Sequence, residues 1–362
     1  MKVATSIVLG NHATPELAGE AVRQAMHKAG IQVANSVLLL LTSEFASNPQ
    51  PAIKAAAKAA NSLQVIGCSA TGIFTEEDWV LDAPAAAVMV FGEEVSLQLP
   101  SVNHELQPLL TLTAPNAINS TWLNNGNQRY GGVSGDAIGQ GPFSVWKNAK
   151  GEVSGYVEAF FTGVTMASQA SHGLRLLTTP QQVEQTSHYD VLKIDHVEAL
   201  SSLQKAWKYH SKSDDPVPLH LIMATYADDA ASINNGQYNL TTVISHDDDN
   251  GSITLAHTLK PGQYLSWGLR DKETAAADFM LTTQKVAATL GKRPDFGLLF
   301  SCLGRGPYFY GGIERDLKVL KQTFPEMPLL GFYGNGEITS IRGINQLLPS
   351  SAVLSLFASK DA

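Results

Sequence analysis

Runs of consecutive apolar residues alternate along this chain with stretches whose apolar residues recur at helical spacing, a pattern typical of an α/β fold. Val37 to Leu41 and Gly297 to Phe300 have no polar interruption, which predicts strands buried on both faces. Leu17 to Ala29 is amphipathic and follows Thr14-Pro15-Glu16, which supplies a capping residue, a first-turn proline and an acid. We therefore predict mixed β-sheets flanked by helices.

One succession of elements occurs twice. The first copy comprises a strand, a helix, a strand, a glycine-rich bend and a strand, at residues 37–41, 50–61, 64–66, 67–73 and 85–91. The second copy has the same order, at residues 297–300, 312–324, 328–330, 331–338 and 352–357. Gly67 and Gly331 open the two bends, and each has another glycine five residues later. We interpret this as internal duplication of a β-α-β-glycine turn-β unit.

A partial third copy is predicted between the other two. A short apolar strand at 109–113 precedes another glycine-rich bend, Tyr130 to Asp136. Because buried strands hold such bends firmly and glycine lets a backbone approach a ligand closely, we expect the three bends to converge on one cleft.

The length of 362 residues predicts two modules. A helical pattern at 192–209 gives way to the polar, proline-containing segment Ser211 to Pro218, which is typical of a linker. We accordingly place the modules at residues 1–212 and 213–362.

Composition and charge argue against several classes of function. The formal net charge is -8 and none of the 25 basic residues forms a run of three, which argues against nucleic-acid binding. No apolar stretch approaches the roughly 18 residues of a membrane-spanning helix. Two cysteines are too few for a disulfide framework or a four-thiolate zinc site, so we expect a cytoplasmic protein.

Motifs for cofactors and metals are absent from the sequence. The ten histidines show no paired-ligand spacing, and Gly291-Lys292-Arg293 lacks the remaining residues of a P-loop. The acidic turn at 247–251 places histidines where a calcium loop needs its first and last carboxylates. We predict no cofactor, no metal ion and no catalytic residue.

Two segments near the C-terminus carry the strongest functional signal. Phe300 to Gly306 and Pro328 to Ile338 each run from an apolar strand into a glycine-rich bend. These segments resemble the C-terminal module of the FIST family (F-box and intracellular signal transduction proteins). Val65 to Gly72 and Tyr130 to Asp136 resemble its N-terminal module, so the resemblance covers nearly the whole chain.

The resemblance implies a sensory domain of signal transduction that binds a small molecule, with amino acids as the ligands proposed for the family. An α-amino acid needs a guanidinium for its carboxylate and an acid for its ammonium group. We assign these roles to Arg305 and Glu337. The other expected ligand-binding residues supply hydrogen bonds or pocket walls: Ser69, Ser134, Cys302, Tyr308, Tyr333 and Asn335.

Three alternatives stay open at this point. In the first, Arg305 and Glu337 serve only as a mutual salt bridge that locks two loops. Cys302, three residues before Arg305, has the surroundings of a thiol nucleophile, which would make the chain a cysteine-dependent enzyme. The family's eukaryotic members also suggest a protein-interaction adaptor with a signalling partner.

Overall fold

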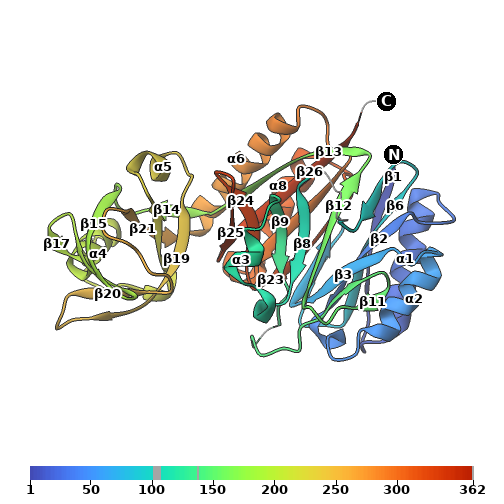
Figure 1. Cartoon of the computed structure of the whole chain (residues 1–362), viewed down its shortest axis with the longest axis horizontal. Coiled ribbons are helices and arrows are strands. Elements are labelled where there is room, and N and C mark those ends of the chain that lie inside the picture. Colours follow the sequence, from blue (N-terminus) through green and yellow to red (C-terminus); the bar gives the residue numbers. More distant parts are fainter. Residues whose placement is uncertain (101–106, 137, 361–362) are drawn as a thin grey trace. The chain divides into compact units, whose positions relative to one another are not determined.

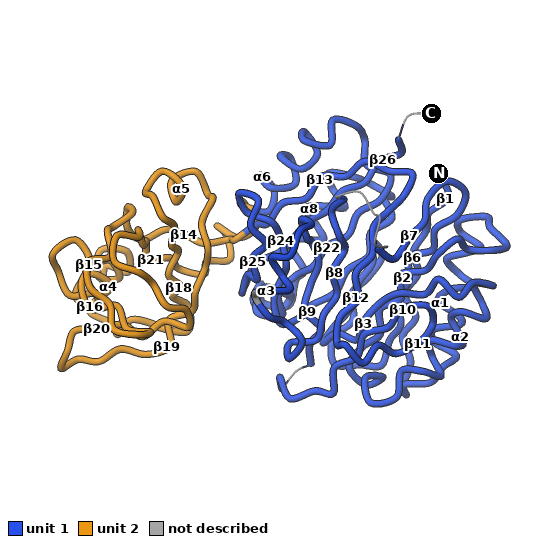
Figure 2. The backbone as a smooth tube through the Cα atoms, in the orientation of Figure 1, with its two compact units in different colours: residues 1–171, 279–362 blue, residues 172–278 orange. Residues whose placement is uncertain are grey.

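The computed structural model describes residues 1–100, 107–136 and 138–360. The fold is mixed α/β, as predicted. The chain forms two compact units (Figure 2), which we call the three-sheet unit, residues 1–171 with 279–362, and the inserted unit, residues 172–278. These units differ from the modules predicted at 1–212 and 213–362, and that module boundary stays a prediction.

The first sheet of the three-sheet unit contains the first predicted repeat. Its strands, in spatial order, are β1 (Lys2–Leu9), β6 (Ala85–Gly92), β2 (Ser36–Thr42), β3 (Val65–Ala70), β10 (Val145–Lys147) and β11 (Lys150–Gly151). β2 and β3 are parallel, whereas β6 is antiparallel to β1 and β2. Helices α1 (Pro15–Ala29) and α2 (Gln50–Ala60) pack together beside this sheet (Figure 1) and bury their alanine-rich faces against it.

A second sheet repeats the arrangement with C-terminal residues. Its strands are β13 (Val164–Ser171), β26 (Ala352–Ser359), β22 (Phe296–Cys302), β23 (Leu329–Gly334), β4 (Gly72–Thr75) and β5 (Trp79–Leu81). β22 and β23 are parallel, and β26 is antiparallel to both β13 and β22. The helices of this repeat are α6 (Lys272–Leu290), α7 (Pro307–Tyr310) and α8 (Arg315–Thr323).

The remaining sheet has the same order again. Its strands are β7 (Ser96–Gln98), β12 (Tyr156–Thr162), β8 (Leu109–Thr113), β9 (Arg129–Val133), β24 (Glu337–Ile341) and β25 (Ile344–Leu348). β8 and β9 are parallel and β12 is antiparallel to β8. In the described residues of this repeat the α-helix is short, α3 (Ser120–Leu123). The predicted duplication is therefore present, and the partial third copy is a third sheet of matching order.

The three sheets exchange hairpins in a cycle. The β4–β5 hairpin follows β3 in sequence but pairs with β23, the β10–β11 hairpin pairs with β3, and the β24–β25 hairpin pairs with β9. One central core contains side chains from all three sheets. Phe91 lies 5.2 Å from Phe161, Phe161 lies 5.4 Å from Phe296, and Phe296 stacks on Phe357 at 4.5 Å, measured between ring centroids. The exchange binds each repeat to the other two.

Each of the three bends begins at a glycine that occupies the same position in its repeat. Gly67, Gly131 and Gly331 each lie beside a parallel neighbour strand, and a Cβ atom there would come 1.7, 1.9 and 2.0 Å from the carbonyl oxygen of its partner residue. Contacts that short do not occur between a Cβ and a backbone oxygen, so these positions exclude every other residue type. The clash that any Cβ atom would make thus explains why glycine recurs at this position of each repeat.

The inserted unit has its own sheet and core. Its strands are β14 (Leu174–Leu176), β15 (Gln181–Ser187), β16 (Asp190–Ile194), β17 (Val197–Glu198), β18 (Ile222–Ala227), β19 (Asn239–Asp247), β20 (Ser252–Leu255) and β21 (Tyr264–Arg270). β18 pairs with both β19 and β21, so the sheet closes on itself. Helix α4 (Ala199–Ser211) contributes Leu203 to the core of this unit, which also contains Trp267. A second, shorter helix, α5, spans Ala230–Asn234. No helix in the described part of the chain has the length and apolar character needed to cross a membrane.

Candidate functional site

The three glycine-rich bends meet at the carboxyl ends of the parallel strand pairs, where α/β proteins commonly bind ligands. The Ser134 hydroxyl donates to the carbonyl oxygen of Ser69 at 2.6 Å, and the two side-chain oxygens are 3.1 Å apart. The amide of Asn335 donates to the carbonyl of Val133 at 3.0 Å, and the amide of Val133 donates to Gly336. The predicted binding residues Ser69 and Ser134 therefore lie in direct contact, and backbone bonds join their bends to that of Asn335.

The fourth residues after the three equivalent glycines, Thr71, Gly135 and Asn335, lie beside one another. A Cβ on Gly135 would lie 2.8 Å from the Thr71 hydroxyl and 3.1 Å from the Asn335 side-chain oxygen. Asn335 is exposed, whereas Thr71 is buried and its hydroxyl has no hydrogen-bond partner among the described residues. This position thus combines a solvent-facing amide with an unsatisfied hydroxyl.

Glu337, the first residue of β24, is fully buried. Neither of its carboxyl oxygens has a hydrogen-bond partner in the described chain. Burial raises the pKa of Glu337 well above its ordinary value. The nearby Ser351 amide, which does not reach hydrogen-bonding geometry, and the Arg305 charge offset this rise only in part. A buried polar group without partners is uncommon in folded proteins and points to a strained or functional position.

Arg305 is also buried, with 2% of its surface exposed, but its hydrogen bonds lead elsewhere. Its Nε donates to Asp316 Oδ2 at 2.8 Å, and its two terminal nitrogens donate to the carbonyl and hydroxyl oxygens of Ser171 at 2.9 Å each. The guanidinium lies 5.6 Å from the ring centroid of Phe279. The structure thus gives Arg305 an ion pair with Asp316. Among the described residues neither carboxyl oxygen of Glu337 accepts a hydrogen bond, and a role for Arg305 and Glu337 as a mutual salt bridge stays untested.

A second acid accompanies Asp316 at the start of α8. Glu314 caps the helix, with Oε2 accepting a hydrogen bond from the Leu317 amide at 3.0 Å, while Oε1 is buried without a partner. The Tyr310 hydroxyl donates to Asp316 Oδ1 at 2.8 Å. Burial and the Asp316 charge raise the pKa of Glu314 from 4.5 to about 8. The carboxyl groups of Glu314 and Asp316 therefore both lie close enough to the Arg305 guanidinium to feel its positive charge.

This raised pKa predicts a pH-dependent stability. Between pH 4.5 and about 8 the folded chain holds a proton on Glu314 that the unfolded chain releases, so stability is greatest below this window and is lost as pH rises through 8. Glu314→Gln keeps an oxygen for the helix cap but cannot titrate. We expect the unfolding free energy of the wild type to fall by a few kcal/mol relative to this variant between pH 5 and 8. Urea denaturation at several pH values measures the difference, and parallel profiles would contradict it.

The remaining predicted residues lie in different surroundings. Tyr333 is fully buried in an apolar cluster, 4.8 Å from the ring of Phe74. Tyr308 is 66% exposed and donates a hydrogen bond to Asp82. Cys302 is partly buried at the end of β22 and is not in a disulfide bond. Among the eight predicted residues, Ser69 and Ser134 have side-chain oxygens within hydrogen-bonding distance of each other.

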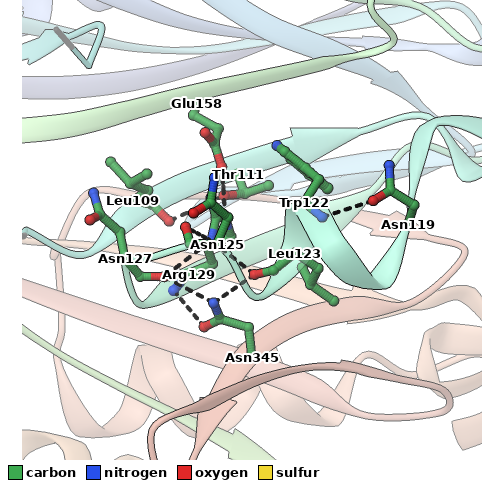
Figure 3. A network of polar contacts seen from close by, with 10 residues as sticks. All are labelled: Leu109, Thr111, Asn119, Trp122, Leu123, Asn125, Asn127, Arg129, Glu158 and Asn345. Atoms are coloured by element: carbon green, nitrogen blue, oxygen red, sulfur yellow. Dashed lines mark hydrogen bonds and ion pairs between the residues drawn. The ribbon is translucent and has the colours of Figure 1, made fainter. Parts of the chain in front are cut away.

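Sequence reasoning missed a second buried arginine (Figure 3). The Nε of Arg129 donates to Glu158 at 2.6 Å, and its Nη1 donates to the carbonyls of Leu123, Asn125 and Asn127. Asn345 also donates to two of these carbonyls and accepts a hydrogen bond from the Arg129 amide. The network fixes the exchanged hairpin to β9. Its only sequence signal is that Arg129 directly precedes the glycine-rich bend, which does not reveal its partners.

The described residues contain no group of three His, Cys, Asp or Glu side chains that could hold a metal ion. Asp247, from the acidic turn, instead accepts hydrogen bonds from the amides of Asp249 and Asn250 within its own hairpin.

Comparison with known proteins identifies part of the chain. An uncharacterized protein of Mycobacterium bovis is 32% identical over 127 residues, which is 35% of this chain and 33% of that protein. F-box only protein 22 of Homo sapiens is 30% identical over 133 residues, 33% of this chain and 32% of that protein. The alignments thus span about a third of the length of these relatives.

The predicted N-terminal FIST module stays a prediction, because the matched family model covers residues 199–340. These residues include Arg305 and Glu337 as well as the bend of Asn335. Because residues 199–340 match the model of the FIST C domain, the resemblance seen in the sequence is confirmed for this segment of the chain.

Proposed function

We propose that this chain is a sensor that binds a small zwitterionic metabolite, such as an amino acid, where the three glycine-rich bends meet. The observation that carries the proposal is Glu337, whose buried carboxyl group has no hydrogen-bond partner among the described residues. An unsatisfied buried polar group costs about 1–3 kcal/mol. A ligand ammonium bound there would remove this cost and form a charge-assisted hydrogen bond.

The carboxylate of the ligand requires donors near the same place. Asn335 offers an exposed side-chain amide, and Ser69 and Ser134 offer hydroxyls. Arg305 remains our proposed carboxylate anchor, but a ligand would have to share or replace its contacts with Ser171 and Asp316. Cys302, Tyr308 and Tyr333 complete the proposed lining.

Access to Glu337 requires movement. Four surface cavities of the described chain are lined by other residues, and Glu337 itself is fully enclosed. The adjoining Gly336 has a φ of 135°, a conformation that glycine adopts without strain. Binding that opens the bends would couple ligand occupancy to a change of conformation, as a sensor requires.

The proposal predicts proton release on binding. An ammonium beside Glu337 lowers the pKa that burial has raised, so the bound carboxyl ionises. We expect calorimetric titration against a panel of amino acids to find a ligand whose binding heat depends on the ionisation enthalpy of the buffer. Glu337→Gln should weaken that binding by tenfold or more.

Glu326→Gln, an equivalent change at an exposed glutamate, is the matched control and should bind as the wild type does. The proposal fails if no zwitterion in the panel binds, or if Glu337→Gln binds as tightly as the control.

The similarity to F-box only protein 22 supports a second candidate function, an adaptor for a signalling protein in the cytoplasm. The enzyme alternative requires a reactive Cys302 thiol. Iodoacetamide labelling near neutral pH tests this alternative, and an unreactive thiol removes the nucleophile.

A further inference from the structure

A surface groove of about 940 Å³ lies between α2 and the turn that joins β10 to β11, two elements that are neighbours in Figure 1. Three lysines line it: Lys54 and Lys58, one turn apart on α2, and Lys150 on β11. All three are exposed. The groove lies at the edge of the first sheet, between a helix of the first repeat and the hairpin exchanged from the third, and shares no residue with the glycine-rich bends.

The charge of the groove differs from that of the chain. Its lining contains no aspartate or glutamate, and the described residues provide no ion-pair partner for any of the three lysines. Lys58 has a partial structural explanation, since a cation is favourable in the last turn of a helix. The helix dipole offers no such explanation for Lys54 or Lys150. Like charges therefore gather in one place on a chain whose net charge is -8.

The floor of the groove is rigid. The Gln50 side chain donates to the carbonyl of Ala149 at 2.9 Å and accepts from the amide of Gly151 at 3.2 Å, which fixes the turn against α2. Asn148 and Ala149 both have positive φ, as in a tight two-residue hairpin turn. β11 is the outermost strand of its sheet, so an extended chain can approach its edge.

One wall is apolar. Leu63 lines the groove with 72% of its surface exposed. The volume is near the upper end of the roughly 300–1,000 Å³ of small-molecule sites, much larger than a single phosphate needs. A segment that carries several carboxylates and an apolar side chain matches this combination.

We propose that the groove between α2 and the β10–β11 turn binds an extended acidic peptide segment of a partner protein, with carboxylates at Lys54, Lys58 and Lys150 and an apolar side chain at Leu63. Charge complementarity favours this occupant. Nucleic acid is disfavoured because the lining offers no arginine and no aromatic ring on which a base could stack.

The test is fluorescence anisotropy of the full chain with a labelled ten-residue peptide of eight glutamates and two leucines. We expect binding that weakens as salt rises, and a loss of tenfold or more in the triple variant Lys54→Glu, Lys58→Glu, Lys150→Glu. The corresponding lysine-to-arginine variant keeps the charge and should keep the affinity. Leu63→Ser should weaken this peptide but leave a peptide of ten glutamates unaffected.

The matched control makes the same charge change at three exposed lysines outside the groove: Lys260→Glu, Lys285→Glu, Lys318→Glu. It should bind within twofold of the wild type. Equal losses in both triple variants would show a general charge effect and overturn the proposal. So would absence of peptide binding, or tighter binding of a labelled ten-nucleotide single-stranded DNA.

Discussion

Gly331→Ala is expected to lower the free energy of unfolding by about 3 kcal/mol or more. The new methyl group would lie 2.0 Å from the carbonyl oxygen of Leu299 and 2.3 Å from the Phe74 ring. Neither neighbour can withdraw easily, because β22 and β23 are paired over six residues and Phe74 is fully buried. Chemical denaturation at constant pH measures the loss.

Gly151→Ala provides the control for this prediction. Gly151 has no atom within 4 Å of its would-be Cβ, and its backbone does not require a positive φ. We expect this change to alter stability by less than about 0.5 kcal/mol. Similar small effects in both variants would mean that the parallel strands separate at little cost, contrary to the close approach seen at all three equivalent glycines.

Arg305→Met is expected to cost about 3–5 kcal/mol of stability, because it leaves Asp316 buried without its cation. Asp316 is fully buried, and its remaining hydrogen bond from Tyr310 does not neutralise a carboxylate. Methionine preserves the apolar contact with Phe279. Equilibrium denaturation near pH 7 measures the effect.

A double-mutant cycle with Asp316→Asn separates the ion pair from simple packing. If the pair is coupled as the geometry indicates, Arg305→Met should cost much less in the Asp316→Asn background than in the wild type. A loss below about 1 kcal/mol in the single variant would contradict the structural role and free Arg305 for the proposed ligand contact.

Much of the fold was predictable because buried strands have a distinctive composition. Val37 to Leu41 and Gly297 to Phe300 lie within β2 and β22, the strands at the centre of their sheets. The repeat was visible because glycine is the only residue that fits beside the neighbouring carbonyl. The helix predicted at 192–209 begins only at Ala199, since β16 and β17 occupy the preceding residues. Short apolar runs are ambiguous between helix and strand.

The hairpin exchange could not be predicted from the sequence. β4 follows β3 directly in the chain, and local rules favour pairing between such neighbours. Its actual partner, β23, is more than 250 residues away along the sequence, and only the closed arrangement of three sheets selects it.

The meeting of the glycine-rich bends was predictable from the sequence, but the hydrogen-bond partners of the buried charged residues were not. The bends that carry Ser69, Ser134 and Asn335 meet as expected from strands that end at a common edge. Arg305 and Glu337 were assigned to the two charged ends of one ligand because their charges are opposite, and that assignment stays a prediction. The structure instead pairs Arg305 with Asp316, on a helix whose orientation no sequence spacing specifies.

The sequence alone determined which segments become strands, where glycine is obligatory and that the same unit recurs, because these properties depend on local composition and backbone sterics. Tertiary structure alone decided which hairpin completes which sheet, that Asp316 receives the guanidinium of Arg305, and that the carboxyl group of Glu337 has no hydrogen-bond partner within the described part of the chain. Those outcomes depend on distances between segments far apart in the chain, which are fixed only when the three sheets close around their shared core.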